Sequence, residues 1–329
     1  MRVVFMGTDK FAVPALKSVI KSGVKLICVV TQPDQPKGRG LKLTPSPIKE
    51  VAIEYNIPIY QPERVRDKQF IEKVEQEFKP ELIIVVAFGQ IIPKAILELP
   101  EYRCINIHPS LLPKYRGAAP IQRAIINGEN ETGVTLMFVD EGEDTGDIIY
   151  QEHLSIGMSD SSEILFEKLA EISARMLLKL LTKEDGSPVE LLMLPRYSQD
   201  HSKATQAPKL TKEDGLINWD KSAYEIHNLI RGTIPWPGAY TTFQLTGSND
   251  MKTFRIWESL LPESSTEKKV KTEPGTITGI TSDSGMVIET GMGELIINIV
   301  QPADKSKMKA KDFVNGYRLK IGDVLGIKS

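Results

Sequence analysis

The 329-residue sequence lacks the glycine-rich signatures that bind nucleotides at a helix N-terminus. Gly7 follows the first apolar segment, where a dinucleotide-binding protein carries Gly-x-Gly-x-x-Gly, but the next residues are Thr8-Asp9-Lys10-Phe11-Ala12. The pattern Gly-x-x-x-x-Gly-Lys-Ser/Thr is also absent. Dinucleotide and P-loop functions are therefore disfavoured. Gly7 and Thr8 can still bind an anion at the head of a helix, although a capped tight turn explains them at least as well.

The sequence also has few cysteines, no long apolar run and a net charge close to zero. The two cysteines, Cys28 and Cys104, lie in apolar surroundings and indicate reduced core residues of a cytoplasmic protein. The longest nearly uncharged apolar run, residues 82–93, is shorter than the roughly 20 residues of a membrane span. We also expect no signal peptide. With 41 Lys and Arg against 43 Asp and Glu, the net charge is −2, so a nucleic-acid partner would have to bind local basic patches.

The first half of the chain alternates β-type and helical segments. Strands are expected at 2–6, 24–30, 82–88, 104–108, 133–139 and 147–154, and helices at 11–21, 47–55, 68–78, 119–127 and 161–181. Segment 82–88 is almost wholly apolar, which is typical of a strand buried on both faces. The pattern predicts an α/β domain over residues 1–184, with a Rossmann-like, doubly wound and mostly parallel sheet.

The pattern changes after residue 184. Residues 185–208 are polar and broken by glycine and proline, and they predict a linker. One helix is expected at 223–231, followed by short strands at 239–243, 253–260, 275–280, 285–290 and 294–300. Several short strands in about 100 residues predict a small β-barrel over residues 209–329, of the oligonucleotide-binding (OB-like) type.

Asn106 and His108 are the first candidates for chemistry. They lie in an apolar strand, and ligands of open α/β sheets bind beyond the carboxyl ends of the strands. Residues two apart on a strand share a face. An amide beside an imidazole suits acyl transfer, because both can direct N–H groups at a developing oxyanion. A buried polar pair that caps the turn before Pro109 explains the two residues equally well.

Five acids crowd the eight residues from Asp140 to Asp147. The loop lacks the alternating oxygen ligands of an EF-hand. With His108 as the one plausible imidazole partner and no cysteine pair, zinc is also disfavoured, and we expect no metal. One carboxylate that orients or protonates His108, among otherwise solvated acids, is the simpler hypothesis.

The sequence around these residues resembles the folate-dependent formyltransferases. The resemblance rests on Asn106-x-His108, Ser110-Leu111-Leu112-Pro113, Tyr115-Arg116-Gly117 and Asp144-Thr145-Gly146. It is closer still to the branch of this family that acts on methionyl-tRNA, and it covers essentially the whole chain. That closer match is carried by residues 31–40, Pro45-Ser46-Pro47, residues 117–123, Trp236-Pro237-Gly238 and Gln301-Pro302-Ala303.

The resemblance implies formyl transfer from 10-formyltetrahydrofolate to the α-amino group of methionine on initiator tRNA, for translation initiation. It implies that Asn106 and His108 stabilise the oxyanion and that Asp144 assists proton transfer, without a metal. The residues it places at the folate are Phe88, Gly89, Gln90, Ser110, Leu111, Leu112, Pro113, Val139 and Asp140.

The segment from Pro36 to Lys49 is rich in proline and glycine and carries lysine and arginine without an acid. A loop of this length is uncommon in a compact domain, and the resemblance implies that it contacts the acceptor stem of the tRNA. Lysines alternate from Lys305 to Lys311 and would face one way in an extended segment, although a solvated face explains them equally well. The residues expected at the tRNA are Lys37, Arg39, Lys42, Arg196, Lys203, Lys209, Lys305, Lys307 and Lys309.

Three hypotheses remain at this point. The leading one is an enzyme, expected to be a monomer, that formylates charged initiator tRNA. The second is a formyltransferase for a small amine, such as an amino sugar nucleotide or a glycinamide ribonucleotide, which would not need the basic loop. The third is a non-catalytic RNA-binding protein, which leaves Asn106, His108 and Asp144 unexplained.

Overall fold

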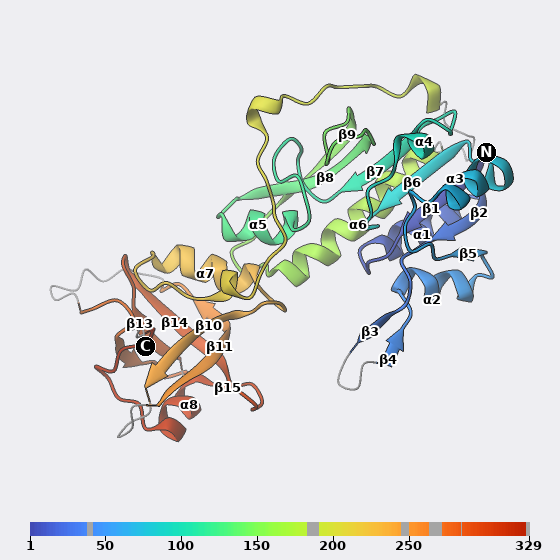
Figure 1. Cartoon of the computed structure of the whole chain (residues 1–329). Coiled ribbons are helices and arrows are strands. Elements are labelled where there is room, and N and C mark those ends of the chain that lie inside the picture. Colours follow the sequence, from blue (N-terminus) through green and yellow to red (C-terminus); the bar gives the residue numbers. More distant parts are fainter. Residues whose placement is uncertain (38–41, 183–190, 245–249, 263–271, 284, 327–329) are drawn as a thin grey trace. The chain divides into compact units, whose positions relative to one another are not determined.

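The computed structural model describes residues 1–37, 42–182, 191–244, 250–262, 272–283 and 285–326 (Figure 1). It divides the chain into two compact units. The first consists of Met1–Pro120, Glu131–Ser155 and Phe166–Pro208, and the second of Ile121–Asn130, Ile156–Leu165 and Lys209–Ser329.

A seven-stranded sheet forms the first unit, in the order β5-β2-β1-β6-β7-β8-β9. Its strands are β1 (Arg2–Gly7), β2 (Lys25–Val30), β5 (Ile59–Tyr60), β6 (Leu82–Val86), β7 (Cys104–His108), β8 (Glu131–Phe138) and β9 (Ile148–Ser155). The strands from β5 to β7 pair in parallel, whereas β8 and β9 are antiparallel. The expected mostly parallel α/β sheet is confirmed, and its antiparallel edge follows directly after β7.

Helices α1 (Ala12–Lys21), α2 (Pro47–Glu54), α3 (Lys68–Lys73), α4 (Lys94–Leu97), α5 (Pro120–Ile126) and α6 (Ser162–Leu181) connect these strands or follow them. On one face of the sheet, Val4 and Met6 belong to a buried cluster with Phe70, Phe78 and Ile96. Side chains alternate between the two faces of a strand. Phe5, which is fully buried, therefore faces the opposite layer.

The structure adds elements that the sequence did not predict. Within the expected loop from Pro36 to Lys49, β3 (Gln35–Lys37) pairs with β4 (Lys42–Thr44) as an antiparallel hairpin. The expected helix at 68–78 changes from α3 into a π turn over Val74–Phe78. That turn ends where Lys79 adopts a left-handed conformation (φ 43°) and its N–H bonds the Val74 carbonyl at 2.9 Å.

The second half of the expected linker is held in the first unit by backbone hydrogen bonds. Tyr197 and Ile148 exchange N–H···O bonds of 2.8 and 2.9 Å. Further along, the Arg116 N–H donates to Thr205 at 2.9 Å, and the Ala207 N–H donates to Arg116 at 2.7 Å. Residues 197–207 therefore line the segment that follows β7.

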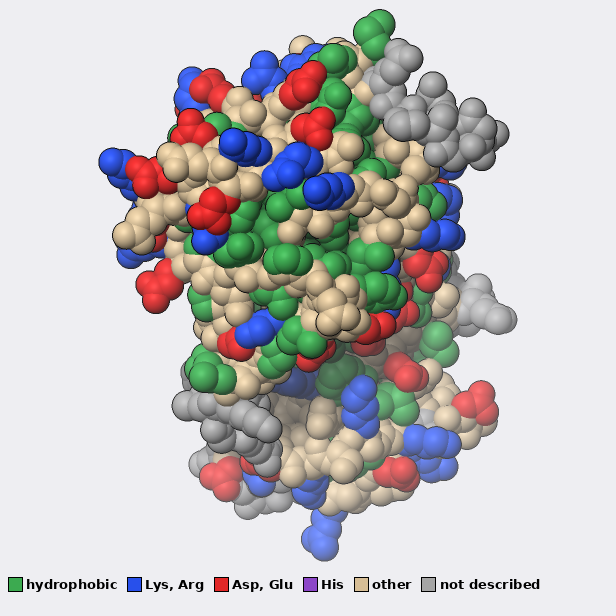
Figure 2. All heavy atoms as spheres, turned by 90° about the vertical axis from the view of Figure 1, so that its right-hand side faces the viewer, with side chains coloured by type: hydrophobic (Ala, Val, Ile, Leu, Met, Phe, Trp, Pro, Cys, Tyr) green, Lys and Arg blue, Asp and Glu red, His purple; other side chains and the backbone are tan. Residues whose placement is uncertain are grey.

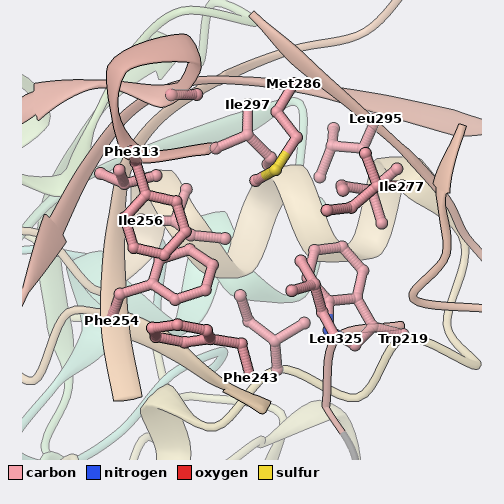
Figure 3. Close-up of a cluster of buried hydrophobic side chains, with 14 of the residues drawn as sticks. Trp219, Phe243, Phe254, Ile256, Ile277, Met286, Leu295, Ile297, Phe313 and Leu325 are labelled. Carbon is pink, nitrogen blue, oxygen red and sulfur yellow. The ribbon is translucent and has the colours of Figure 1, made fainter. Parts of the chain in front are cut away.

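The second unit contains an antiparallel sheet in the order β10-β11-β14-β13-β12, with β15 paired to β14. Its elements are α7 (Ala223–Gly232), β10 (Ala239–Gln244), β11 (Met251–Leu260), β12 (Ile277–Ile280), β13 (Met286–Glu289), β14 (Glu294–Pro302), β15 (Met308–Lys309) and α8 (Ala310–Tyr317). Phe243, Phe254 and Phe313 pack against one another at the centre of its core, with ring centroids 4.5–5.7 Å apart (Figure 3). The strands expected in this region are confirmed.

The lysine segment after β14 differs from the expectation. Within it only Met308–Lys309 is a strand, and helix α8 begins at Ala310. Lys311 therefore lies on a helix, and the alternating lysines do not share one extended face. The backbone turns there because Ala310 and Phe313, both fully buried, draw this segment onto the core of the unit.

The face of the molecule shown in Figure 2 has no separation of charge sign. Lysine and arginine side chains are interspersed with aspartate and glutamate over the face shown in Figure 2, in agreement with the net charge of −2. No helix in the described part of the chain combines the length and apolarity needed to cross a membrane.

Candidate active site

Strand β7 presents Asn106 and His108 from its carboxyl-terminal half. The strand pairs in parallel with β6 and antiparallel with β8, where Asn106 lies opposite Met137 and His108 opposite Thr135. His108 is 4% exposed, so its imidazole is largely removed from water. Their spacing of two places both polar side chains on one side of the strand, as the sequence pattern predicted.

Asp144 is brought to both residues from the acidic loop between β8 and β9. Its Oδ1 lies 3.4 Å from Asn106 Nδ2, and its Oδ2 lies 3.4 Å from His108 Nδ1. The Gly117 N–H donates to the same Oδ2 at 2.8 Å. The carboxylate therefore meets three N–H donors from two segments that are far from it in sequence.

The second imidazole nitrogen of His108 lies 2.9 Å from the Tyr115 carbonyl oxygen. A carbonyl oxygen only accepts, and so does an ionised carboxylate, so a neutral imidazole can donate to one of the two neighbours. Only the imidazolium donates to both Tyr115 and Asp144. The two imidazole nitrogens of His108 are thus held between the Tyr115 carbonyl and the Asp144 carboxylate, next to the amide of Asn106.

Two of the other acids of this loop have partners away from His108. Asp140 Oδ1 accepts from the Thr145 hydroxyl at 2.7 Å and from the Gly142 N–H at 3.1 Å, which closes the turn. Glu141 pairs with Lys94 at 2.9 Å. The structure thus singles out Asp144 as the acid that faces Asn106 and His108.

Gln199 is the residue that the sequence analysis missed. Its Nε2 donates to the carbonyls of Asp144 at 2.9 Å and Gly146 at 2.7 Å, and its Oε1 accepts from Arg116. Gln199 lies in the segment expected to be a linker, and a single polar residue there carries no signal of such a contact. Only the pairing of residues 197–207 with the segment after β7 reveals it.

Two cavities open within the first unit. One of about 400 Å³ lies beside the acidic loop and is lined in part by Phe138, Val139, Asp140, Gly146 and Gln199. The other, of about 630 Å³, is lined in part by Gln32, Arg64, Arg66, Gly89 and Gln90. Val139 and Asp140 therefore line one cavity, and Gly89 and Gln90 line the other.

The chain matches the family model described as formyl transferase over residues 1–181, and the model of the formyl transferase C-terminal domain over residues 209–318. The chain belongs to the formyl transferase family. It is 45% identical over 330 residues to the methionyl-tRNA formyltransferase of Desulforamulus reducens, covering all of this chain and 98% of that one. It is also 45% identical over 326 residues to the methionyl-tRNA formyltransferase of Clostridioides difficile, covering 99% and 100%.

Solved structures with the same fold are more distant in sequence. WlaRD, a sugar 3N-formyl transferase, matches this formyltransferase with a TM-score of 0.64 at 23% identity, over 93% of this chain and 99% of that one. An N-formyltransferase from Helicobacter canadensis gives a TM-score of 0.62 at 21% identity, over 92% and 99%. At these identities the likeness shows a shared fold.

The expected folate residues that follow β7 are buried in the formyltransferase to different degrees. Ser110 is fully buried, where its hydroxyl donates to the Lys114 carbonyl at 2.6 Å, and Leu112 is 3% exposed. Leu111 and Pro113 are half-buried. Ser110 and Leu112 can thus shape a ligand pocket through the backbone more readily than through their side chains.

The cations expected at the tRNA lie in different surroundings. Lys37 and Lys42 belong to the β3–β4 hairpin, and Arg39 lies outside the described residues. The guanidinium carbon of Arg196 lies 4.0 Å from the Phe138 ring centroid, beside the 400 Å³ cavity. Lys203 Nζ forms an ion pair with Asp200 Oδ2 at 3.2 Å. Arg196 is therefore placed at a pocket of the first unit.

In the second unit, Lys209 is exposed and Lys309 directly precedes α8. Lys305 and Lys307 lie over aromatic rings, with Lys305 Nζ 5.1 Å from the Tyr317 centroid and Lys307 Nζ 3.4 Å from that of Trp257. Both lysines therefore make cation–π contacts within the second unit.

The cysteines match their expected role. Cys28 and Cys104 are free and buried, and burial raises the pKa of each thiol to about 12. Both thiols therefore stay protonated and unreactive at neutral pH. Among the residues that the structure describes, no group of three or more histidines, cysteines or acids is placed to hold a metal ion.

Proposed function

We propose that this formyltransferase transfers the formyl group of 10-formyltetrahydrofolate to the α-amino group of methionyl initiator tRNA. The product, formylmethionyl-tRNA, starts translation. One observation carries the chemistry: the Asp144 carboxylate lies against Asn106, His108 and the Gly117 N–H at the end of β7. The full-length identity of 45% to methionyl-tRNA formyltransferases supports the substrate.

In the proposed reaction, the amine nitrogen bonds to the formyl carbon, the bond from that carbon to N10 of the folate breaks, and the amine's proton ends on N10. Asn106 Nδ2 and the His108 imidazolium donate to the oxygen that becomes negative. Donors fixed in a dry site stabilise such a charge without having to reorganise. Asp144 keeps His108 protonated and assists the proton transfer, directly or through water.

We place the formyl donor in the 400 Å³ cavity, lined by Val139 and Asp140, with Leu111 and Pro113 near its reacting end. The cavity of about 630 Å³ is lined in part by Arg64 and Arg66, and guanidinium groups suit the carboxylates of a folate. Phe88, Gly89 and Gln90 follow β6 beside that cavity. No metal is needed in this scheme, because the positive charge proposed for His108 stabilises the oxyanion.

For the tRNA we propose two regions. The β3–β4 hairpin, with Lys37, Arg39 and Lys42, would contact the acceptor stem through phosphates and base edges. Residues 209–329 would act as an OB-like module that binds RNA through Lys305, Lys307 and Lys309, with Lys209 and Lys203 continuing the basic track. The domain boundaries we propose are 1–184 and 209–329, joined by residues 185–208.

The strand order of the second sheet is open in the described part of the chain, so the barrel that we propose requires one further pairing. Its end strands are β10 and β12, and hydrogen bonding between these two would close it. We further propose that the enzyme works as a monomer in the cytoplasm, where charged tRNA and folate are available.

The assay that tests this function mixes the protein with 10-formyltetrahydrofolate and charged initiator tRNA, and then with small amines. The amines are an amino sugar nucleotide and glycinamide ribonucleotide. We expect formylation of the tRNA at a kcat/KM far above that of either small amine. Preferential formylation of a small amine would replace the tRNA proposal, and no transfer to any of them would leave only an RNA-binding role.

A further inference from the structure

We propose that Gln199 and Arg116 form a positioning pair that fixes the Asp144 loop for catalysis. The proposal rests on the catalytic role proposed above for Asp144. The hydrogen bonds of Gln199 go to Arg116 and to the carbonyls of Asp144 and Gly146, so its effect on the reaction would pass through Asp144.

The orientation of the Gln199 amide is set by its neighbours. An arginine only donates hydrogen bonds and a peptide carbonyl only accepts them. Arg116 Nε and Nη2 lie 3.2 and 2.6 Å from Oε1, which leaves Nε2 facing the carbonyls of Asp144 and Gly146 at 2.9 and 2.7 Å. Both side chains are buried, at 6% exposure each, so these bonds do not compete with bulk water.

The loop needs such a restraint because Asp144 is in the left-handed region, with φ at 53°. That conformation is disfavoured for residues with a side chain and persists where the surroundings hold it. Gly146 adds a second constraint, since a Cβ there would collide with the Phe138 carbonyl oxygen. The Gln199 side-chain amide thus binds the carbonyls of Asp144 and Gly146, the two residues that flank Thr145.

Arg116 also sits between two residues that contact the catalytic groups. The Tyr115 carbonyl is hydrogen-bonded to His108 Nε2, and the Gly117 N–H donates to Asp144 Oδ2. Arg116 itself is paired through its backbone to Thr205 and Ala207, and its Nη2 lies 3.1 Å from His201 Nδ1. The buried guanidinium therefore links the segment after β7 to the loop that carries Asp144.

Gln199→Met tests the pair, because methionine has a similar volume and neither donates nor accepts strongly. We expect kcat to fall about 10- to 100-fold, the effect of a catalytic group displaced by roughly 1 Å, while the KM values for folate and tRNA stay within about twofold. Gln199→Glu should lower kcat further, because it places a carboxylate oxygen next to the carbonyl oxygens of Asp144 and Gly146, and these repel one another. The matched control is Asn228→Leu, which removes a buried amide whose Oδ1 accepts from the buried Arg231 at 3.0 Å in the second unit. It should lower Tm similarly and leave kcat unchanged.

A double-mutant cycle with Asp144→Asn separates positioning from general destabilisation. If Gln199 acts through Asp144, Gln199→Met should lower kcat less than about threefold further in the Asp144→Asn background. Arg116→Lys, which keeps the charge but loses the planar fork, gives a second cycle should Gln199→Met fail to fold. Additive losses, an effect mainly on KM, or an unchanged kcat would overturn the proposal. An Asp144→Asn enzyme with normal kcat would refute the proposed role of Asp144 instead, and the pair would then have no catalytic purpose.

Discussion

Replacing Asp144 with asparagine tests the proposed chemistry with the least change in shape. The asparagine oxygen can still accept from the Gly117 N–H, which lies 2.8 Å from Oδ2 in the native protein. Its amide nitrogen then takes the place of Oδ1 and faces Asn106 Nδ2, which lies 3.4 Å from that oxygen in the native protein. Two donors would face each other, and the imidazolium would lose its negative neighbour.

The expected loss follows from the geometry. The side chains of His108 and Asp144 are 6% and 16% exposed, so their attraction is only partly screened. At 3.4 Å and an effective dielectric constant of about 20, two unit charges attract by about 5 kcal/mol. General acid–base assistance contributes about 10²- to 10⁴-fold in rate, which equals about 2.7–5.4 kcal/mol. We therefore expect kcat to fall within this range.

The assay is steady-state formylation of charged initiator tRNA with both substrates saturating. Asp140→Asn is the control on the same loop. Its remaining carbonyl oxygen can still accept from Thr145 and Gly142, so we expect a loss of less than about tenfold in kcat, below the range for general acid–base help. Equal losses from the two variants would mean that the loop acts through bulk charge or folding. A kcat near that of the wild type for Asp144→Asn would refute the reasoning.

Asn106→Ala and His108→Ala should each lower kcat on the order of 10²- to 10³-fold, the usual effect of losing one oxyanion donor. Loss of folate affinity with normal kcat would contradict that role. The double variant Arg39→Ala, Lys42→Ala should raise the KM for charged tRNA and leave that for folate unchanged. Each lost phosphate contact should also flatten the plot of log affinity against log salt by roughly 0.7–0.9, and unchanged tRNA kinetics would favour the small-amine alternative. Burial lowers the pKa of His227 below its usual 6.5, so the unfolded chain binds a proton more readily than the folded one. The second unit should therefore lose thermal stability as the pH falls through 6.5, and His227→Gln should reduce that loss; equal pH dependence in both proteins would show that His227 does not contribute.

The regular elements were predictable where hydrophobic periodicity is strong. Segment 104–108 is strand β7 at the predicted bounds, and the five strands expected after residue 238 all exist, with ends shifted by a few residues. The hairpin of β3 and β4 was missed, since proline and glycine made its segment look irregular. Helix α8 was missed because alternating lysines imitate an extended strand, whereas burial of Phe313 decided the helix.

The sequence by itself determined the α/β class, the family and the candidates Asn106 and His108. Each of these depends on local spacing in the sequence. Apolar runs mark the strands that become buried, and residues two apart on a strand share a face. Only the tertiary structure decided which of five acids meets His108, because the choice depends on where the loop after β8 folds relative to the end of β7. It also decided the role of Gln199, which is 55 residues from Asp144 and contacts it through backbone carbonyls. Every residue has such a carbonyl, so no side-chain pattern in the sequence marks this contact.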